Sequence, residues 1–104
     1  MVHHIKDYQV FDDNRFTKKD IETTGKIKRF VLNFKKGQVL PPHKHPNTDV
    51  FLYIVEGKGT CLFDDEKVDV SENDTLHVNG NQMISIENND DEPLSVFVIL
   101  TPTA

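Results

Sequence analysis

The sequence predicts an all-β domain, folded as a sandwich or a barrel, and three observations carry this prediction. Short segments rich in β-branched and aromatic residues follow one another closely along the chain. Glycine, asparagine and aspartate separate these segments, as they do at turns between strands. Only residues 16–25, FTKKDIETTG, have helical character, and Thr24-Gly25 ends that segment early. Many strands with short turns are typical of sandwiches and barrels.

The predicted strands are bounded by turn residues from residue 26 onward. Alternation is clearest in residues 26–37, where Phe30, Leu32 and Phe34 share one face and Gly37 ends the strand. The other predicted strands are residues 49–59, two strands in residues 60–70 joined at Asp64-Asp65, and three in residues 74–100, broken at residues 79–81 and 88–93.

The apolar run from Val50 to Val55 shows no alternation, which indicates a strand covered on both faces. One face would point into the barrel, and the other needs a second sheet or a second subunit. The chain is too short to supply a covering layer of helices. We therefore expect a homodimer, because uncovered apolar patches usually mark interfaces.

Length and charge exclude several classes of protein. At 104 residues the chain is expected to form one domain, residues 1–104, in which residues 1–25 are an N-terminal strand or extension. The net charge is −5 and the lysines are dispersed among acidic and apolar residues, so we expect no nucleic-acid partner. No segment approaches the roughly 20 apolar residues of a membrane span, so no membrane partner is expected.

The N-terminus and the single cysteine favour a cytoplasmic location. The first eleven residues lack a long apolar segment after their charges, so they do not resemble a secretory signal. Cys61 is the only cysteine, so no internal disulfide can form, which fits a reducing compartment. Its position between Thr60 and Leu62 indicates a small buried side chain in a strand rather than a reactive thiol.

His43 and His45 are the strongest candidates for metal ligands. Alternate residues of a strand point to the same side, so both imidazoles could reach one ion at bond lengths of about 2.0–2.2 Å. The competing interpretation is a pair of exposed imidazoles on a loop that follows Pro41-Pro42. His3 and His4 lie far from this segment and are assigned no role.

The same segment resembles the first conserved motif of the cupins. Gly37 is followed after five residues by His43, Lys44 and His45, then by a short polar loop and an apolar strand that ends at Gly57. Residues 71–83, SENDTLHVNGNQM, occupy the place of the second cupin motif, and the resemblance extends over residues 30–102. It implies a small single-domain jelly-roll barrel of two antiparallel sheets, usually dimeric, with a metal ion in its mouth.

In the cupin family that ion is held by two histidines and a glutamate of the first motif and a histidine of the second. His43 and His45 match the first two ligands. Six residues separate the family's glutamate from the closing glycine, and Val50 stands at that position. Asp49 is one place earlier, and it faces away from the cavity unless the strand begins after it or contains a bulge.

The second motif departs from the family in the same way. With Gly80 as the motif glycine, Met83 takes the position of the fourth ligand, and a thioether suits copper(I) better than iron or manganese. His77, six residues earlier, could substitute from an adjacent strand. The alternatives are a solvated loop role for Asp49, a structural strand role for His77 and a core position for Met83.

Two functions follow from the resemblance and from the residues. The first is a metal-dependent enzyme acting on a small organic substrate, with a divalent transition metal (Zn, Ni, Fe or Mn) held by His43 and His45, with Asp49 and His77 as candidates for further ligands. The second is a non-catalytic cupin that binds a small molecule in an apolar pocket lined by Val50, Met83 and their neighbours. The sequence does not choose between an enzyme and a binding protein, and no catalytic residue is assigned.

Overall fold

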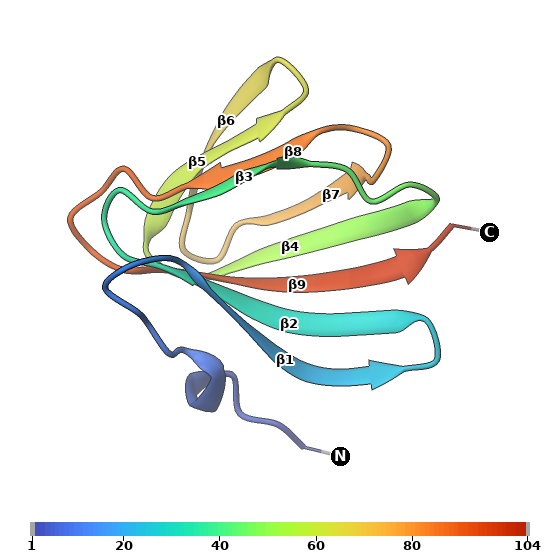
Figure 1. Cartoon of the computed structure of the whole chain (residues 1–104), viewed down its shortest axis with the longest axis horizontal. Coiled ribbons are helices and arrows are strands. Elements are labelled where there is room, and N and C mark those ends of the chain that lie inside the picture. Colours follow the sequence, from blue (N-terminus) through green and yellow to red (C-terminus); the bar gives the residue numbers. More distant parts are fainter. Residues whose placement is uncertain (1, 104) are drawn as a thin grey trace.

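The computed structural model describes residues 2–103, which form two antiparallel sheets and one short 3-10 helix (Figure 1). This all-β architecture is the one predicted from the strand and turn pattern. The elements are η1 (Ile5–Tyr8), β1 (Thr17–Thr24), β2 (Ile27–Phe34), β3 (Val39–His43), β4 (Thr48–Glu56), β5 (Lys58–Phe63), β6 (Glu66–Ser71), β7 (Thr75–Asn79), β8 (Ile84–Glu87) and β9 (Leu94–Pro102).

The two sheets have the strand orders β1-β2-β9-β4-β7 and β3-β8-β5-β6. The chain crosses repeatedly between the sheets, which gives the jelly-roll barrel that the resemblance implied. The turn between β1 and β2, the loop between β3 and β4 and the end of β9 all lie at the same end of the molecule (Figure 1). Residues distant in sequence therefore meet at this end.

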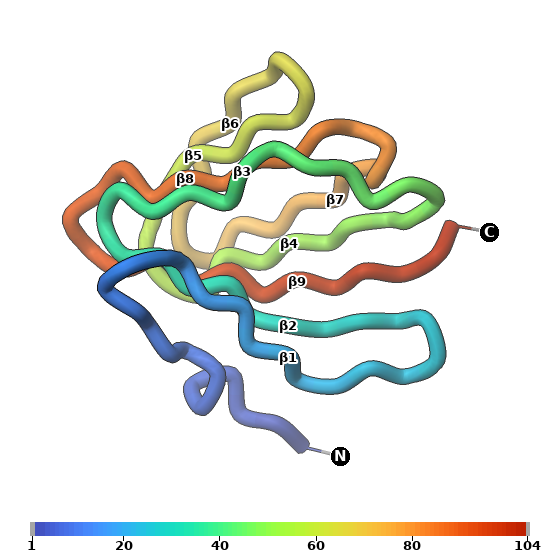
Figure 2. Tube along the Cα trace, viewed as in Figure 1, coloured from blue at the N-terminus to red at the C-terminus, as the bar shows by residue number. Residues whose placement is uncertain are grey.

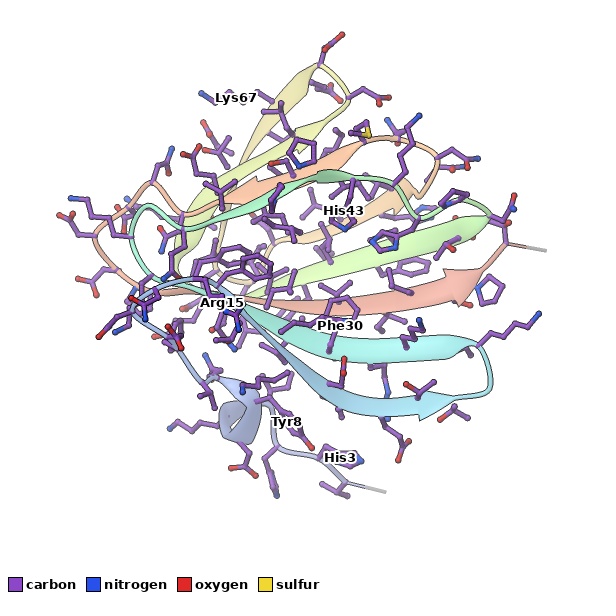
Figure 3. All side chains as sticks on the ribbon, in the orientation of Figure 1. His3, Tyr8, Arg15, Phe30, His43 and Lys67 are labelled. Carbon is purple, nitrogen blue, oxygen red and sulfur yellow. The ribbon has the colours of Figure 1, made fainter. Side chains whose placement is uncertain are left out.

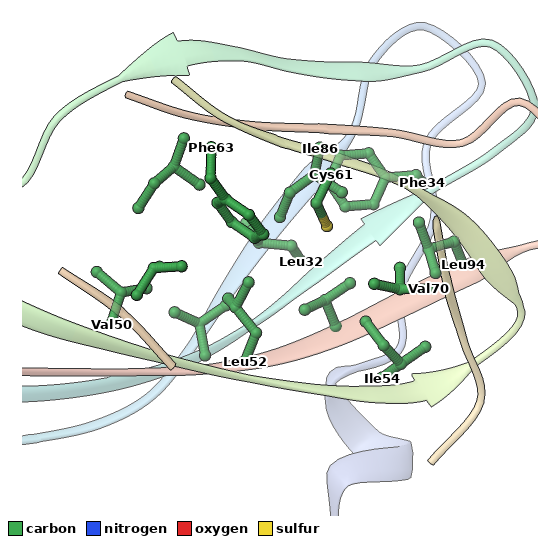
Figure 4. Close-up of a cluster of buried hydrophobic side chains, with 14 of the residues drawn as sticks. Leu32, Phe34, Val50, Leu52, Ile54, Cys61, Phe63, Val70, Ile86 and Leu94 are labelled. Atoms are coloured by element: carbon green, nitrogen blue, oxygen red, sulfur yellow. The ribbon is translucent and has the colours of Figure 1, made fainter. Parts of the chain in front are cut away.

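The core lies between the sheets and is made of alternating inward side chains. Val50, Leu52 and Ile54 of β4 point toward Cys61 and Phe63 of the opposite sheet (Figure 4), and all five are buried. Burial raises the pKa of the Cys61 thiol to about 12, so the thiol stays protonated. Cys61 is thus the small buried side chain that the sequence predicted.

The helical character of residues 16–25 does not produce a helix, because residues 17–24 form strand β1, within the N-terminal strand or extension expected for residues 1–25. Its partner is β2, with Thr17 opposite Asn33 and Thr24 opposite Ile27. The threonines of this segment fit a pleated strand better than a helix, and pairing with β2 outweighs its weak helical propensity. Gly25, in the left-handed region at φ 60°, provides the turn between the two strands.

The expectation that Val50–Val55 is covered on both faces is not met within this chain. Val50, Leu52 and Ile54 are buried, but Phe51 and Tyr53 are 40% and 37% exposed on the outer face of β4. The strand therefore alternates in burial although it does not alternate in hydrophobicity. Its outer aromatic residues lack a covering layer from residues 2–103.

Strand β3 was not predicted, because Pro41 and Pro42 interrupt its sequence. It lies at the edge of its sheet, and its register against β8 shifts between Leu40 and His43. Proline has no N–H to donate, so strands that contain it are restricted to sheet edges and bulges. The edge position of β3 accommodates both prolines and leaves His43 at the end of the strand.

The N-terminal segment runs along the outside of the five-stranded sheet (Figure 2). The buried Asn33 side chain donates to the Tyr8 carbonyl oxygen over 2.8 Å and accepts from the Ser95 hydroxyl over 2.7 Å. Gln9 donates to the same hydroxyl oxygen. These bonds attach the segment across β2 and β9, so it covers part of the sheet's outer face.

The only helix in residues 2–103 is η1, and no helix there is long and apolar enough to cross a membrane.

Candidate functional site

A cavity of about 210 Å³ lies between the two sheets, near the end of the barrel that carries the loop between β3 and β4. Its wall is largely apolar and comes from both sheets, with Phe30 and Val50 from one sheet and Ile84 and Ile86 from the other. Figure 3 marks Phe30 and His43, which contribute to this wall from β2 and β3. The polar lining residues are Lys18, Lys28, His43 and His45, which we call the rim because each is exposed or half-buried.

His43 and His45 converge at this rim. The Nε2 atoms of the two imidazoles are 2.9 Å apart, and the rings meet edge to face. The Nδ1–H of His43 donates to the Pro41 carbonyl oxygen over 2.9 Å. With the His43 proton on Nδ1, its Nε2 accepts the hydrogen bond from Nε2–H of His45. The sequence prediction that the two imidazoles reach one point is met, although His45 lies beyond the end of β3.

The loop that carries His45 is held by Gly80. The backbone N–H of His45 donates to the Gly80 carbonyl over 2.8 Å, and the Gly80 N–H donates to the Thr48 carbonyl over 2.7 Å. A Cβ atom at residue 80 would lie 2.6 Å from the Thr48 carbonyl oxygen and would also overlap that of His45. Only glycine allows this close approach, so Gly80 positions His45 through the backbone.

The surroundings of His45 favour its neutral form. Burial is the largest cause that lowers the pKa of this imidazole, and electrostatic interaction with the neighbouring His43, Lys18 and Lys28 lowers it further. A neutral imidazole is the form that accepts hydrogen bonds or binds metal ions.

Asp49 and His77 lie together on the outer face of the five-stranded sheet. His77 Nε2 donates to Asp49 Oδ1 over 2.8 Å, and its ring stacks on Phe51 with the centroids 4.6 Å apart. Residues 49 and 51 of β4 face opposite to Val50, which lines the cavity. The regular register of β4 against β7 thus separates Asp49 and His77 from His43 and His45, and the four candidate ligands form two distant pairs.

A family model described as the cupin domain matches residues 30–100, more than half of the chain. The chain belongs to the cupin family. This small cupin domain is also similar, at 33% identity over 60 residues, to an uncharacterized protein from Methanocaldococcus jannaschii. That match covers 58% of this chain and 48% of the relative, so it spans about half of the relative's length.

Two solved structures share the fold over almost their whole length. A protein from Thermus thermophilus has a TM-score of 0.91 at 14% identity, and the match covers 99% of this cupin and 98% of that chain. An RmlC-like cupin from Desulfovibrio desulfuricans has a TM-score of 0.87 at 24% identity, covering 100% and 98% respectively. These similarities establish the jelly-roll fold and nothing finer.

The residues of this cupin supply only half of the four-ligand metal set described for the family. Two imidazole nitrogens 2.9 Å apart match neighbouring ligands of one ion, since two bonds of about 2.05 Å at a right angle span about 2.9 Å. The Pro41 carbonyl also orients His43 as outer-shell groups orient metal-binding histidines. However, no group of three or more histidine, cysteine, aspartate or glutamate side chains within residues 2–103 is arranged to hold a metal.

The positions that face the histidine pair are apolar. Val50 lines the cavity where the family spacing requires a carboxylate. On β8, Ile84 pairs with His43 and lines the cavity, whereas Met83 precedes the strand and does not line it. The sequence alignment placed Met83 at the barrel mouth. In the structure the neighbouring residue, Ile84, takes this place opposite His43.

Sequence reasoning missed the contribution of β1 and β2 to the site. Phe16 and Lys18, next to and within β1, and Lys28 of β2 line the cavity. The sequence predicted a strand or extension within residues 1–25 but did not give the bounds of β1 or its place in the barrel wall. The signal for Lys28 was present, because it precedes the inward residues Phe30 and Leu32 at the same period of two.

Proposed function

We propose that this cupin binds a small, largely apolar organic molecule in the cavity between its sheets. The observation that carries this proposal is the cavity itself, about 210 Å³ in volume, with an apolar wall and a few polar groups gathered at its rim. Ligand sites are commonly concave and apolar with a small number of convergent polar groups.

The chemistry of the lining supports binding over catalysis. No aspartate or glutamate is among the described residues that line the cavity, so its proton-exchanging groups are the two histidines and the two lysines. The histidines already bond to each other, and Val50 and Ile84 present hydrocarbon to the space beside them. An apolar cavity wall favours a ligand that fits its shape and buries apolar surface in it.

The test uses three neutral probes of increasing length: benzamide, 2-phenylacetamide and 3-phenylpropionamide, together with the corresponding carboxylates. An engineered apolar cavity of about 150 Å³ holds benzene, so probes of this size suit the present volume. Titration followed by amide chemical shifts should give saturable changes in β2, β3 and β8. Absence of saturable binding for all amides and all carboxylates would contradict the proposal.

A pair of tryptophan variants tests the location of binding. Leu40 of β3 lines the cavity, whereas Leu62 of β5 is on the outer face of the same sheet. Leu40→Trp should fill the cavity and weaken probe binding at least about tenfold, which corresponds to ~1.4 kcal/mol. Leu62→Trp should leave binding unchanged. Equal affinities in the two variants would place the probe elsewhere and overturn the assignment to this cavity.

A second candidate function, weak binding of a divalent transition metal, is favoured by one observation. The two Nε2 atoms are 2.9 Å apart and His43 is oriented by the Pro41 carbonyl. Zinc, nickel, iron and manganese all accept imidazole together with oxygen donors, so this pair would form part of such a site. With only two protein ligands we expect weak affinity.

Val50→Glu tests this second function by adding a carboxylate beside the histidine pair. A third ligand should tighten nickel binding at least about tenfold in calorimetric titration. Stability should be measured with and without nickel, because a buried carboxylate without a metal is costly. Asp49→Ala is the control and should not change nickel affinity. Unchanged nickel affinity after His43→Ala and His45→Ala would refute this function.

A further inference from the structure

The rim of the cavity carries positive and neutral groups but no negative one among the described residues. Lys18 and Lys28 line the cavity beside His43 and His45. An adjoining surface hollow shares Lys28 and His45 with the cavity and adds Lys26 and Lys44, again with no lining aspartate or glutamate. The whole chain has 17 acidic and 12 basic residues, so this local excess of lysine opposes the overall charge.

The two lysines are aimed at the cavity by the register of the hairpin formed by β1 and β2. Lys18 lies opposite Leu32, and its Nζ is 4.7 Å from the ring centroid of Phe30, which lines the cavity. Lys28 alternates with Phe30 on the inward face of β2. The hairpin therefore places the ammonium groups of Lys18 and Lys28 and the ring of Phe30 at the same opening of the cavity.

These positive charges are only partly neutralised by the protein. Lys18 Nζ is 3.7 Å from Asp20 Oδ1, an exposed pair that water screens strongly. Lys28 forms no ion pair with any of the described residues. The Lys28 charge is therefore free to interact with an anion at the rim.

We propose that the molecule held in this cavity is a small organic carboxylate. Its apolar part lies between the sheets, and its carboxylate group meets the Lys28 ammonium group at the rim, with Lys18 contributing from the β1 side. This inference rests on the proposed binding function and specifies its ligand class. Lysines around a partly dry opening attract an anion and repel a cation, which gives specificity by charge in addition to shape.

The test compares each carboxylate with its neutral amide of nearly the same shape: benzoate, phenylacetate and 3-phenylpropionate against the three amides named above. At low salt, at least one carboxylate should bind about tenfold or more tightly than its amide. Raising the salt concentration from about 0.05 M to 0.5 M should reduce this preference, because the rim is open to solvent. The affinity of the amides should respond little to salt.

Charge-removing variants assign the preference to the rim. Lys28→Met and Lys18→Met keep the approximate side-chain length and remove the ammonium group, so each should lower the ratio of carboxylate affinity to amide affinity severalfold. Lys67→Met is the matched control, since Lys67 lies on β6, an edge strand of the four-stranded sheet, and lines neither the cavity nor the adjoining hollow. It should change neither affinity.

The possible outcomes separate this inference from the function on which it rests. Amide binding with no preference for the carboxylates would overturn the ligand class and leave the binding function intact. Binding of neither series would overturn both. A carboxylate preference that survives in the double variant Lys18→Met/Lys28→Met, with Lys67→Met unchanged, would show that other groups recognise the anion and would also overturn the inference.

Discussion

At the residue scale, His45 is half-buried and lies near another imidazole and two lysines. Its pKa is lowered first by burial and then by electrostatic interaction with His43, Lys18 and Lys28. In the unfolded chain the same imidazole titrates at about 6.5. Below that pH the unfolded state therefore binds more protons at residue 45 than the folded state does, and protonation favours unfolding.

This difference predicts a pH dependence of stability. The contribution of His45 is constant above about pH 6.5 and decreases as pH falls from there toward the lower folded-state pKa. His45→Gln removes the titrating group, so the variant should lose less unfolding free energy than the wild type between about pH 7.5 and 5.5. Urea unfolding at both pH values measures this difference.

A direct titration of the imidazole provides the check on this prediction. The His45 ring resonances should report a pKa below about 6.5, the ordinary histidine value. A value at or above that ordinary pKa, or equal losses of stability in wild type and His45→Gln, would contradict the environment described for this residue.

Individual residues of the site were predictable only in part. Strand alternation predicted that His43 and His45 converge, and their Nε2 atoms are 2.9 Å apart. However, β3 ends at His43, and the loop held by Gly80 positions His45. The roles considered for Asp49 and His77 depended on two strands at once. Their register places both on the outer face, and a single sequence carries too little information to fix such a register.

At the element scale, the loop between β3 and β4 depends on a close backbone approach at Gly80. Gly80→Ala would push a methyl group against the carbonyl oxygens of His45 and Thr48. We expect a loss of about 1–3 kcal/mol in unfolding free energy, typical of overpacking. The displaced loop should also shift the His45 backbone amide signal.

The neighbouring Gln82 provides the control for this prediction. Gln82 lies two residues after Gly80, and Gln82→Ala keeps the backbone hydrogen bonds of Gly80 with Thr48 and His45. Urea unfolding and the amide spectrum of the two variants should therefore differ clearly. Wild-type stability and an unshifted His45 amide in Gly80→Ala would show that the loop does not depend on this contact.

Elements bounded by turn residues were predictable, whereas elements stabilised mainly by their partners were not. The turn at Asp64, with φ 55°, separates β5 from β6 where the acidic pair predicted it. Strand β1 has a polar sequence of mixed propensity and becomes a strand by pairing with β2. Strand β3 contains two prolines and is allowed by its edge position. The bounds of β1 and the existence of β3 depend on tertiary context rather than on local pattern.

At the scale of the whole molecule, the fold was more predictable than the site because many weak signals agree on it. Seven strands and their turns were readable from the sequence, and the spacing of the first motif resembled that of the cupins. The chemistry depends on a few positions, and Val50 and Ile84 present apolar side chains to the cavity there. A fold tolerates such replacements, so the same barrel can host different functions.

The outer face of the five-stranded sheet retains an uncovered apolar surface. Phe51 and Tyr53 of β4 are 40% and 37% exposed, and they lie opposite the half-buried Ile99 and Phe97 of β9. The N-terminal segment attaches near β2 and the start of β9 and leaves this part of β4 open. We propose that a second copy of the chain covers it, because an isologous pair buries the same patch on both subunits.

Phe51→Glu tests this homodimer against the control Leu62→Glu. Wild type should sediment at twice the 11.9 kDa chain mass at micromolar concentration. A charge at residue 51 would have to be buried in the interface, so Phe51→Glu should weaken the dimer at least about tenfold. Leu62 is 39% exposed on the opposite sheet, so Leu62→Glu should leave the dimer intact. A monomeric wild type would contradict the homodimer. Equal effects of the two substitutions would show that the dimer interface does not include the exposed aromatic residues of β4.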